Sequence, residues 1–209
     1  MELKGNNTLP GYRVFEYMLI LNPHEALQEK IKNVRAEFET AFKPEYKIGG
    51  RPNLGLVQWI QYELMEMRVV NKLKLVAMGF PPFKIELNGF GSYPAHSIFI
   101  KTGSPEAVKK LIREVRETAQ SLMKLNKENK PHFFDESNIT IARKLVPWQY
   151  EKAWLEYSQK HFTGRFIADG MLLLKRRHGD KTAGWQIVQR FEFANLPIHN
   201  VLAEQGELF

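Results

Sequence analysis

The stretch that decides the fold is SNITIARKL, residues 137–145, a strand pattern whose apolar run begins on a polar residue. Side chains alternate between the two faces of a strand, so Asn138 and Thr140 are expected on the same face. An amide and a hydroxyl at the head of an otherwise apolar strand indicate a face that is turned toward a cleft rather than toward the core.

The stretch RPNLGLVQW, residues 51–59, repeats this arrangement earlier in the chain. Its strand also begins on an asparagine, Asn53, and Gly55 takes the place that Thr140 has in the later stretch. Two strands of one pattern predict two related lobes that meet across a single cleft.

Hydrophobic periodicity predicts the elements around the two stretches. Alternating or branched apolar runs indicate strands, and apolar residues at spacings of three and four indicate helices, with GFGSYPAH at 89–96 as a turn. The predicted strands are 12–21, 53–59, 83–90, 97–101, 138–143, 166–177 and 185–193, and the predicted helices are 23–42, 61–78, 104–122 and 147–158.

Length and composition favour one domain over residues 1–209, because 44% hydrophobic residues are enough for a sizeable core. The chain has no cysteine, which excludes disulfides, thiolate zinc sites and cysteine nucleophiles and favours a cytoplasmic location. No apolar run approaches the roughly 20 residues that span a bilayer, and the first residues lack a secretory pattern. No membrane association is expected.

The formal net charge of +7 and the isoelectric point near 9.5 permit attraction to RNA. A solvated basic surface explains the same charge, and charge alone favours that explanation. The most basic run, KRRHGDK at 175–181, is typical of a hairpin tip.

The two asparagine strands and the segments around them resemble the 2H phosphoesterase superfamily, in particular its 2'-5' RNA ligase and cyclic phosphodiesterase branch. The resemblance implies a two-lobed α+β fold, with antiparallel sheets related by a pseudo-twofold axis, a central groove and helices on the outside. It also implies one His-x-Thr motif in each lobe and substrates with 2',3'-cyclic phosphates or 2'-5' linkages. The segments that carry it are YRVFEYMLILNP, RPNLGLVQW, LNGFGSYPAHSIFIKT, SNITIARKL, FIADGMLLLKRR and WQIVQRFEF.

At the motif positions implied by this resemblance, Asn53 and Asn138 stand in place of both histidines, and Gly55 stands in place of the first hydroxyl. Thr140 alone keeps the motif residue. An amide forms hydrogen bonds but does not transfer protons near neutral pH, so the acid–base mechanism of the family is not expected to operate.

Three functions follow from these positions as alternatives. The first is a degenerate groove that binds RNA ends or a phosphorylated nucleotide without catalysis. The second is an altered phosphodiesterase that uses Thr140, Lys144 and either His96 or a bound water. The third is a scaffold for interactions with other proteins.

Lys144 is the cation predicted to reach a phosphate in the groove, because it keeps the strand parity of Asn138 and Thr140. Arg143 is expected on the opposite face. Alternatively, Lys144 is a solvent-exposed lysine at the end of its strand.

Aromatic side chains that could stack a base at the rim are Tyr12, Trp59 and Tyr93, although each also fits a place in the core or on the surface. His96 follows a predicted turn, which favours a structural role or a place at the rim. No histidine spacing indicates a metal site, no cofactor is expected, and a monomer is the expected state.

Overall fold

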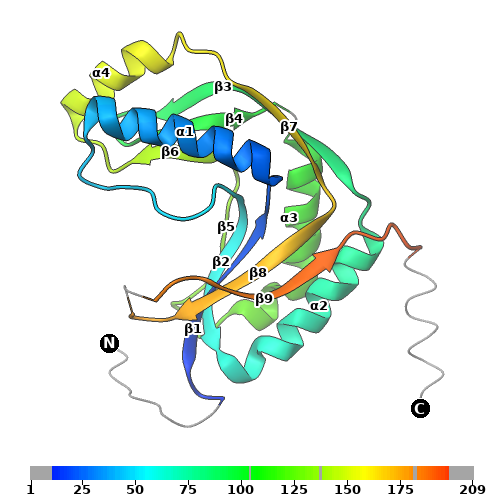
Figure 1. The fold of residues 1–209 in the computed structure, drawn as a ribbon. Helices are drawn as coiled ribbons and strands as arrows, with labels where there is room; N and C mark the ends of the chain where they lie inside the picture. The colour runs from blue at the N-terminus through cyan, green and yellow to red at the C-terminus, as the bar shows by residue number, and fades with distance from the viewer. Residues whose placement is uncertain (1–10, 104, 137, 181–182, 198–209) are drawn as a thin grey trace, which may run out of the picture.

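A computed structural model describes residues 11–103, 105–136, 138–180 and 183–197. Its strands form two antiparallel sheets, one in each of two lobes that lie one above the other in Figure 1. The helices cover the outer sides of the lobes. The predicted α+β fold is confirmed.

The sheet of the lower lobe has five strands in the order β5-β2-β1-β8-β9. Strands β1 and β2 are adjacent in this sheet and pair over their whole lengths, from Val14 opposite Tyr62 to Leu21 opposite Leu54. The strands are β1 (Val14–Leu21), β2 (Leu54–Tyr62), β5 (His132–Phe133), β8 (Gly170–Arg177) and β9 (Gln186–Glu192).

The sheet of the upper lobe has four strands in the order β6-β4-β3-β7. The second asparagine stretch supplies its edge strand, β6, which pairs with β4. The strands are β3 (Phe83–Tyr93), β4 (Ser97–Thr102), β6 (Ile139–Arg143) and β7 (Thr163–Ala168).

Two helices pack on the lobe opposite to the one that holds the strand before them, so neither lobe is built from one continuous piece of chain. The first helix follows a strand of the lower sheet but packs on the upper one, and the third does the reverse. The helices are α1 (Glu25–Phe42), α2 (Glu66–Gly79), α3 (Glu106–Ala119) and α4 (Pro147–Tyr157), with short 3-10 turns at Glu63–Met65 and Gln120–Met123.

The core face of α1 follows the predicted apolar stripe, with Leu27, Ile31, Phe38 and Phe42 buried. Burial of one such side chain contributes about 1.5–3 kcal/mol, so this stripe fixes the helix on the upper sheet. One charged residue, Arg35, is buried on the same face.

The first asparagine strand, β2, contains a β-bulge. Gly55 pairs with β1 and so does Val57, but Leu56 between them has no partner of its own in the register. The extra residue reverses the alternation of side chains beyond it, so Leu56 and Val57 are both buried and Gln58 points the same way as Gly55.

The second asparagine strand, β6, has a bulge at the matching place. Thr140 and Ala142 pair with β4 and Ile141 is skipped, so Ile141 and Ala142 are both buried. Arg143 therefore returns to the face that carries Thr140. The likeness of the two stretches extends from sequence to backbone geometry.

The observed elements differ from the predicted ones in several places. The predicted strand 166–177 is broken at Asp169, where the chain leaves the upper sheet and enters the lower one. Gly170 permits this crossing, because a Cβ there would lie 2.4 Å from the Phe191 carbonyl oxygen. Strand β5, only two residues long, lies in a polar segment whose pattern gave no strand signal.

The predicted turn 89–96 is also shorter than expected, because β3 continues to Tyr93 and pairs with β4. Gly89 lies in a bulge with a φ of 65°, and Gly91 leaves room for the Phe99 ring, which a Cβ would approach to 2.5 Å. Gly89 therefore allows a kink in the paired strand, and Gly91 allows the Phe99 ring to pack closely against it.

Candidate functional site: a groove between the two lobes

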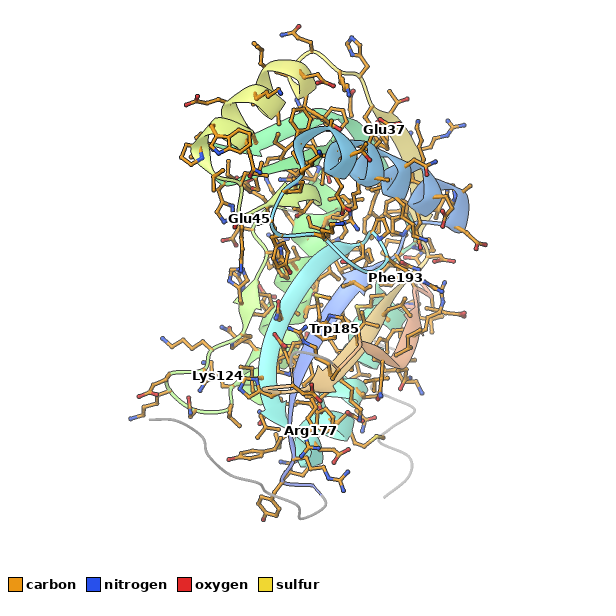
Figure 2. All side chains as sticks on the ribbon, turned by 60° about the vertical axis from the view of Figure 1, so that its left-hand side comes forward. Glu37, Glu45, Lys124, Arg177, Trp185 and Phe193 are labelled. Atoms are coloured by element: carbon orange, nitrogen blue, oxygen red, sulfur yellow. The ribbon has the colours of Figure 1, made fainter. Side chains whose placement is uncertain are left out.

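A groove of about 360 Å³ is lined by residues of both lobes. Its volume lies at the lower end of the range of small-molecule sites. The loop 43–53, which connects α1 to β2, contributes part of the lining, and Glu45 marks this loop between the lobes in Figure 2. The lining residues are Met18, Arg35, Ile48, Gly49, Arg51, Asn53, Gly55, Gln58, Tyr93, Ser97, Phe99, Phe134, Glu136, Asn138, Thr140 and Arg143.

The structure brings together the four residues that the resemblance assigns to the motif positions. Asn53 and Gly55 reach the groove from the start of β2, and Asn138 and Thr140 reach it from the start of β6. Asn53 donates a hydrogen bond of 3.0 Å to the Arg51 carbonyl oxygen of its own loop. The two asparagines are thus the matching heads of two strands that face one groove.

Arg35 is the buried cation of the groove, with 8% of its surface exposed. Its Nε and Nη2 donate to the Thr140 carbonyl oxygen at 3.1 and 2.9 Å, and its Nη1 donates to the Gly50 carbonyl oxygen at 3.4 Å. A guanidinium has five N–H donors, so some remain for a ligand.

The charge of Arg35 persists at neutral pH. Burial lowers the pKa of its guanidinium to about 10, with Glu39 raising the pKa and Arg143 lowering it. A pKa of about 10 still leaves the group protonated at pH 7, although burial makes the charge costly without an anion nearby.

Two more arginines, Arg51 and Arg143, line the same groove. The Arg143 guanidinium lies over the Tyr46 ring, 4.5 Å from its centre, and donates a hydrogen bond to the Tyr46 hydroxyl. In the part of the chain that the structure describes, neither these two arginines nor Arg35 form an ion pair with a carboxylate. The arrangement favours an anion as ligand.

One carboxylate, Glu136, also lines the groove, and the Tyr93 hydroxyl donates a hydrogen bond to it. Burial and then Glu136 raise the pKa of Tyr93, whereas a hydrogen bond from the Asn138 amide lowers it. Tyr93 is therefore a protonated phenol that joins a motif asparagine to the glutamate.

Three predicted rim residues do not reach the groove. Trp59 is 3% exposed and stacks on Tyr17 at 5.4 Å in the core, so it cannot stack a base. Tyr12 packs edge-on against Tyr62, at the opposite end of β2 from the motif. His96 is exposed in the turn between β3 and β4.

The predicted roles of Lys144 and Arg143 are exchanged. The bulge at Ile141 shifts the parity of the strand, so Arg143 lines the groove and Lys144 does not. Lys144 adopts a left-handed backbone with φ of 56°, and its ammonium lies 4.9 Å from the centre of the Tyr46 ring. In a regular strand Lys144 would share the face of Thr140, but the bulge gives that face to Arg143.

No histidine among the described residues lines the groove. Within the same ranges, no cluster of three or more histidine, aspartate or glutamate side chains is arranged to hold a metal ion. The described helices include none that is long and apolar enough to cross a membrane.

The lining residues that the sequence did not point to include Arg35, Arg51, Phe134 and Glu136. A signal for Arg35 was available, because it lies four residues after Ile31 and three before Phe38, within the apolar stripe of the predicted helix. A charge on the buried face of a helix indicates a partner or a ligand. Phe134 had no signal, since its segment shows no periodicity.

The fold is similar to several solved structures of low sequence identity. E. coli LigT complexed with 3'-AMP shares 12% identity and a TM-score of 0.64, over 87% of this chain and 98% of that one. TT0787 of Thermus thermophilus shares 14% identity and a TM-score of 0.61, over 87% of this chain and all of that one. At such identities the likeness concerns the fold alone. No curated protein sequence matches the chain.

The family is established by the sequence. The family model described as 2'-5' RNA ligase superfamily matches residues 56–180, which is more than half of the chain and includes the second motif strand. The α+β fold with its two antiparallel sheets accords with that match, and the chain belongs to the 2'-5' RNA ligase superfamily.

Proposed function

We propose that the groove binds the phosphate of an RNA end or of a phosphorylated nucleotide and does not hydrolyse it by imidazole acid–base catalysis. The observation that carries the proposal is the buried Arg35, which lines the groove together with Arg51 and Arg143. Among the described residues the Glu39 carboxylate raises the pKa of Arg35 but forms no ion pair with it. A phosphate would offset the positive charge of the three arginines and accept hydrogen bonds from their guanidinium groups.

The solved structures support the class of ligand. E. coli LigT, which has a similar fold, has been solved with 3'-AMP, with ATP and with phosphate. In the present chain the asparagines keep hydrogen-bonding capacity at both motif heads but provide no proton transfer near neutral pH. Binding of a nucleotide phosphate therefore fits the groove better than the family reaction does.

The altered phosphodiesterase that used Lys144 and His96 has less support, because neither residue lines the groove. Thr140 and the hydrogen-bonded pair of Tyr93 and Glu136 do line it. Repurified protein that hydrolyses a cyclic phosphate would favour this alternative, whereas a protein scaffold would bind no phosphate.

Arg143→Ala is expected to weaken the binding of 3'-AMP by about tenfold, because a charge-assisted hydrogen bond contributes about 1.5–3 kcal/mol and this exposed group is partly screened. Isothermal titration calorimetry at low salt measures the effect. Arg177→Ala is the matched control, since Arg177 is an exposed cation at the far end of the lower lobe (Figure 2). Equal losses in both variants would contradict a site in the groove.

A further inference from the structure

Helix α4 carries an apolar stripe on the side that it turns to solvent. Trp148 is 63% exposed and Leu155 is 79% exposed, the highest value among the large apolar side chains that the structure describes. The other side of the helix is already packed, because Gln149, Ala153 and Tyr157 are buried. The helix lies at the outer edge of the upper lobe (Figure 1), and neither exposed residue lines the groove. The stripe therefore has no part in the proposed function.

The geometry of the helix places the two apolar residues in one line. Successive helical residues are turned by about 100°, so Trp148 and Leu155 point in the same direction to within about 20°. They are about 10 Å apart along the helix axis. Exposed apolar side chains that align on one helix, rather than lying scattered over the surface, are typical of a contact surface.

Two charged residues flank this line, one on each side. Glu151 and Lys152 lie between the apolar residues in the sequence and about 50° to either side of them around the helix. Both are exposed, and within the described ranges neither forms an ion pair. The third charged residue of the helix, Glu156, is paired with Lys160 at 2.6 Å. The helix therefore presents one unpaired charge of each sign beside its apolar stripe.

This arrangement is complementary to itself in one of two possible orientations. When two copies of the helix lie side by side and parallel, related by a twofold axis along their length, Trp148 meets Trp148 and Leu155 meets Leu155. Glu151 of each copy then lies beside Lys152 of the other. When the two helices are antiparallel, like charges meet instead, because each flank then faces its own counterpart. The charges therefore favour a parallel pair.

We propose that the exposed face of α4 is a self-association surface on which a second copy of this chain docks, with the two helices parallel and a twofold axis between them. Charge complementarity identifies the partner, because a surface that presents both signs in this pattern fits its own copy. Trp148 is the expected anchor, since tryptophan is enriched among the residues that dominate binding at interfaces. The inference does not depend on the ligand of the groove.

The small size of the contact sets the expected affinity. One face of a helix of 11 residues is expected to bury less than the roughly 800 Å² per partner of a standard interface, so we expect a dissociation constant on the order of 100 µM. The expected monomer is then the form present in dilute solution, and dimers form as the concentration rises.

Sedimentation velocity of the full chain, over a series of concentrations up to about 1 mM, measures the association. Wild-type protein is expected to shift from monomer to dimer over this range, and Trp148→Ala is expected to weaken the dimer at least about tenfold. Glu151→Lys and Lys152→Glu are each expected to weaken it about tenfold at low salt, because each replaces attraction between the copies by repulsion.

A mixture of the two charge-reversed variants isolates the contact between copies. In a mixed dimer both charge pairs are attractive again, so the mixture is expected to dimerise at least as tightly as wild type. The double variant Glu151→Lys with Lys152→Glu is expected to regain wild-type association. Glu117→Lys, the same change at an exposed position of α3, is the matched control for net charge and is expected to stay within about twofold of wild type.

A single introduced thiol tests the orientation, because the chain has no cysteine. Leu155→Cys is expected to form a disulfide-linked dimer under mild oxidation, whereas Glu117→Cys is not. In an antiparallel pair the two thiols would lie about 10 Å apart along the helices, but a disulfide requires Cα atoms within about 7 Å.

Wild-type protein that remains monomeric up to about 1 mM would overturn the proposal and leave the stripe to a partner other than this chain. A dimer that Trp148→Ala retains unchanged would also overturn it, as would charge-reversed variants that associate with one another no more tightly than with themselves. A dimer that passes these tests but gives no disulfide in Leu155→Cys would overturn the parallel orientation.

Discussion

The double variant Asn53→His with Asn138→His is expected to hydrolyse 2',3'-cyclic AMP at least about 10²-fold faster than wild-type protein. Both side chains line one groove at the heads of strands with matching bulges, so both imidazoles would face a bound phosphate. A positioned acid or base contributes typically about 10²–10⁴-fold to a rate. Product formation by repurified protein, followed by chromatography over a range of pH, measures the gain.

The single variants are the controls for this experiment. The attacking water and the leaving oxygen lie on opposite sides of phosphorus in an in-line displacement, so one imidazole reaches only one of them. Each single variant is therefore expected to gain much less than the double variant. A bell-shaped dependence of the rate on pH would identify two titrating groups. A double variant that binds nucleotide like wild type but gains no activity would contradict the assignment of these positions.

The missing first hydroxyl limits how far the activity can be restored. Gly55→Thr adds it, but the new Cβ would lie 2.9 Å from the Phe134 ring. We therefore expect Gly55→Thr to raise the rate of the double-histidine variant only when Phe134→Ala is also present. Circular dichroism and the affinity for inorganic phosphate report whether each combination is folded.

Replacing Arg35 by methionine is expected to weaken the binding of inorganic phosphate by about 10²-fold. A hydrogen bond from a charged donor contributes about 1.5–3 kcal/mol, and burial of this guanidinium reduces screening by solvent. The effect is expected to exceed that of Arg143→Ala, because Arg143 is exposed. Calorimetric titration of both variants under one salt condition measures the difference.

The stability of the unliganded Arg35→Met variant is expected to change by less than about 2 kcal/mol. Loss of donors to the Thr140 and Gly50 carbonyl oxygens costs about 1–3 kcal/mol, but removal of a buried charge offsets part of this cost. Urea unfolding without phosphate measures the free energy. Arg35→Lys keeps the charge but not the planar guanidinium, so it is expected to bind phosphate with intermediate affinity. Wild-type affinity for phosphate in Arg35→Met would exclude Arg35 from the binding site.

The fold was predictable where the sequence pattern is regular. The predicted stripe of α1 consists of Leu27, Ile31, Val34, Phe38 and Phe42. Four of these residues are buried and Val34 is half-buried, because helical spacing places them on one face. The predicted strand 166–177 was wrong in one respect, since alternation does not reveal that a chain changes sheets at Asp169. That change depends on packing against the distant Phe191.

The repeated pattern predicted that the two asparagine strands meet at one cleft, and both line the groove, but the surrounding cations were not predicted. A bulge adds one residue to a strand and so turns every later side chain to the opposite face. The simple alternation therefore pointed to Lys144, whereas Arg143 lines the groove. The paired apolar residues Ile141 and Ala142 are the trace of this bulge in the sequence. Phe134 meets Gly55 only through the tertiary fold, which no local pattern encodes.

The central claim is that the groove binds a nucleotide phosphate and leaves it chemically unchanged. Phosphorus NMR of wild-type protein titrated with 2',3'-cyclic AMP at neutral pH tests binding and hydrolysis together. We expect a saturable change in the resonance of the cyclic phosphate, weakened in Arg35→Met, with no phosphomonoester after prolonged incubation. A monoester that forms in proportion to the concentration of repurified protein would contradict the absence of hydrolysis, and a cyclic resonance that the protein never perturbs would contradict binding.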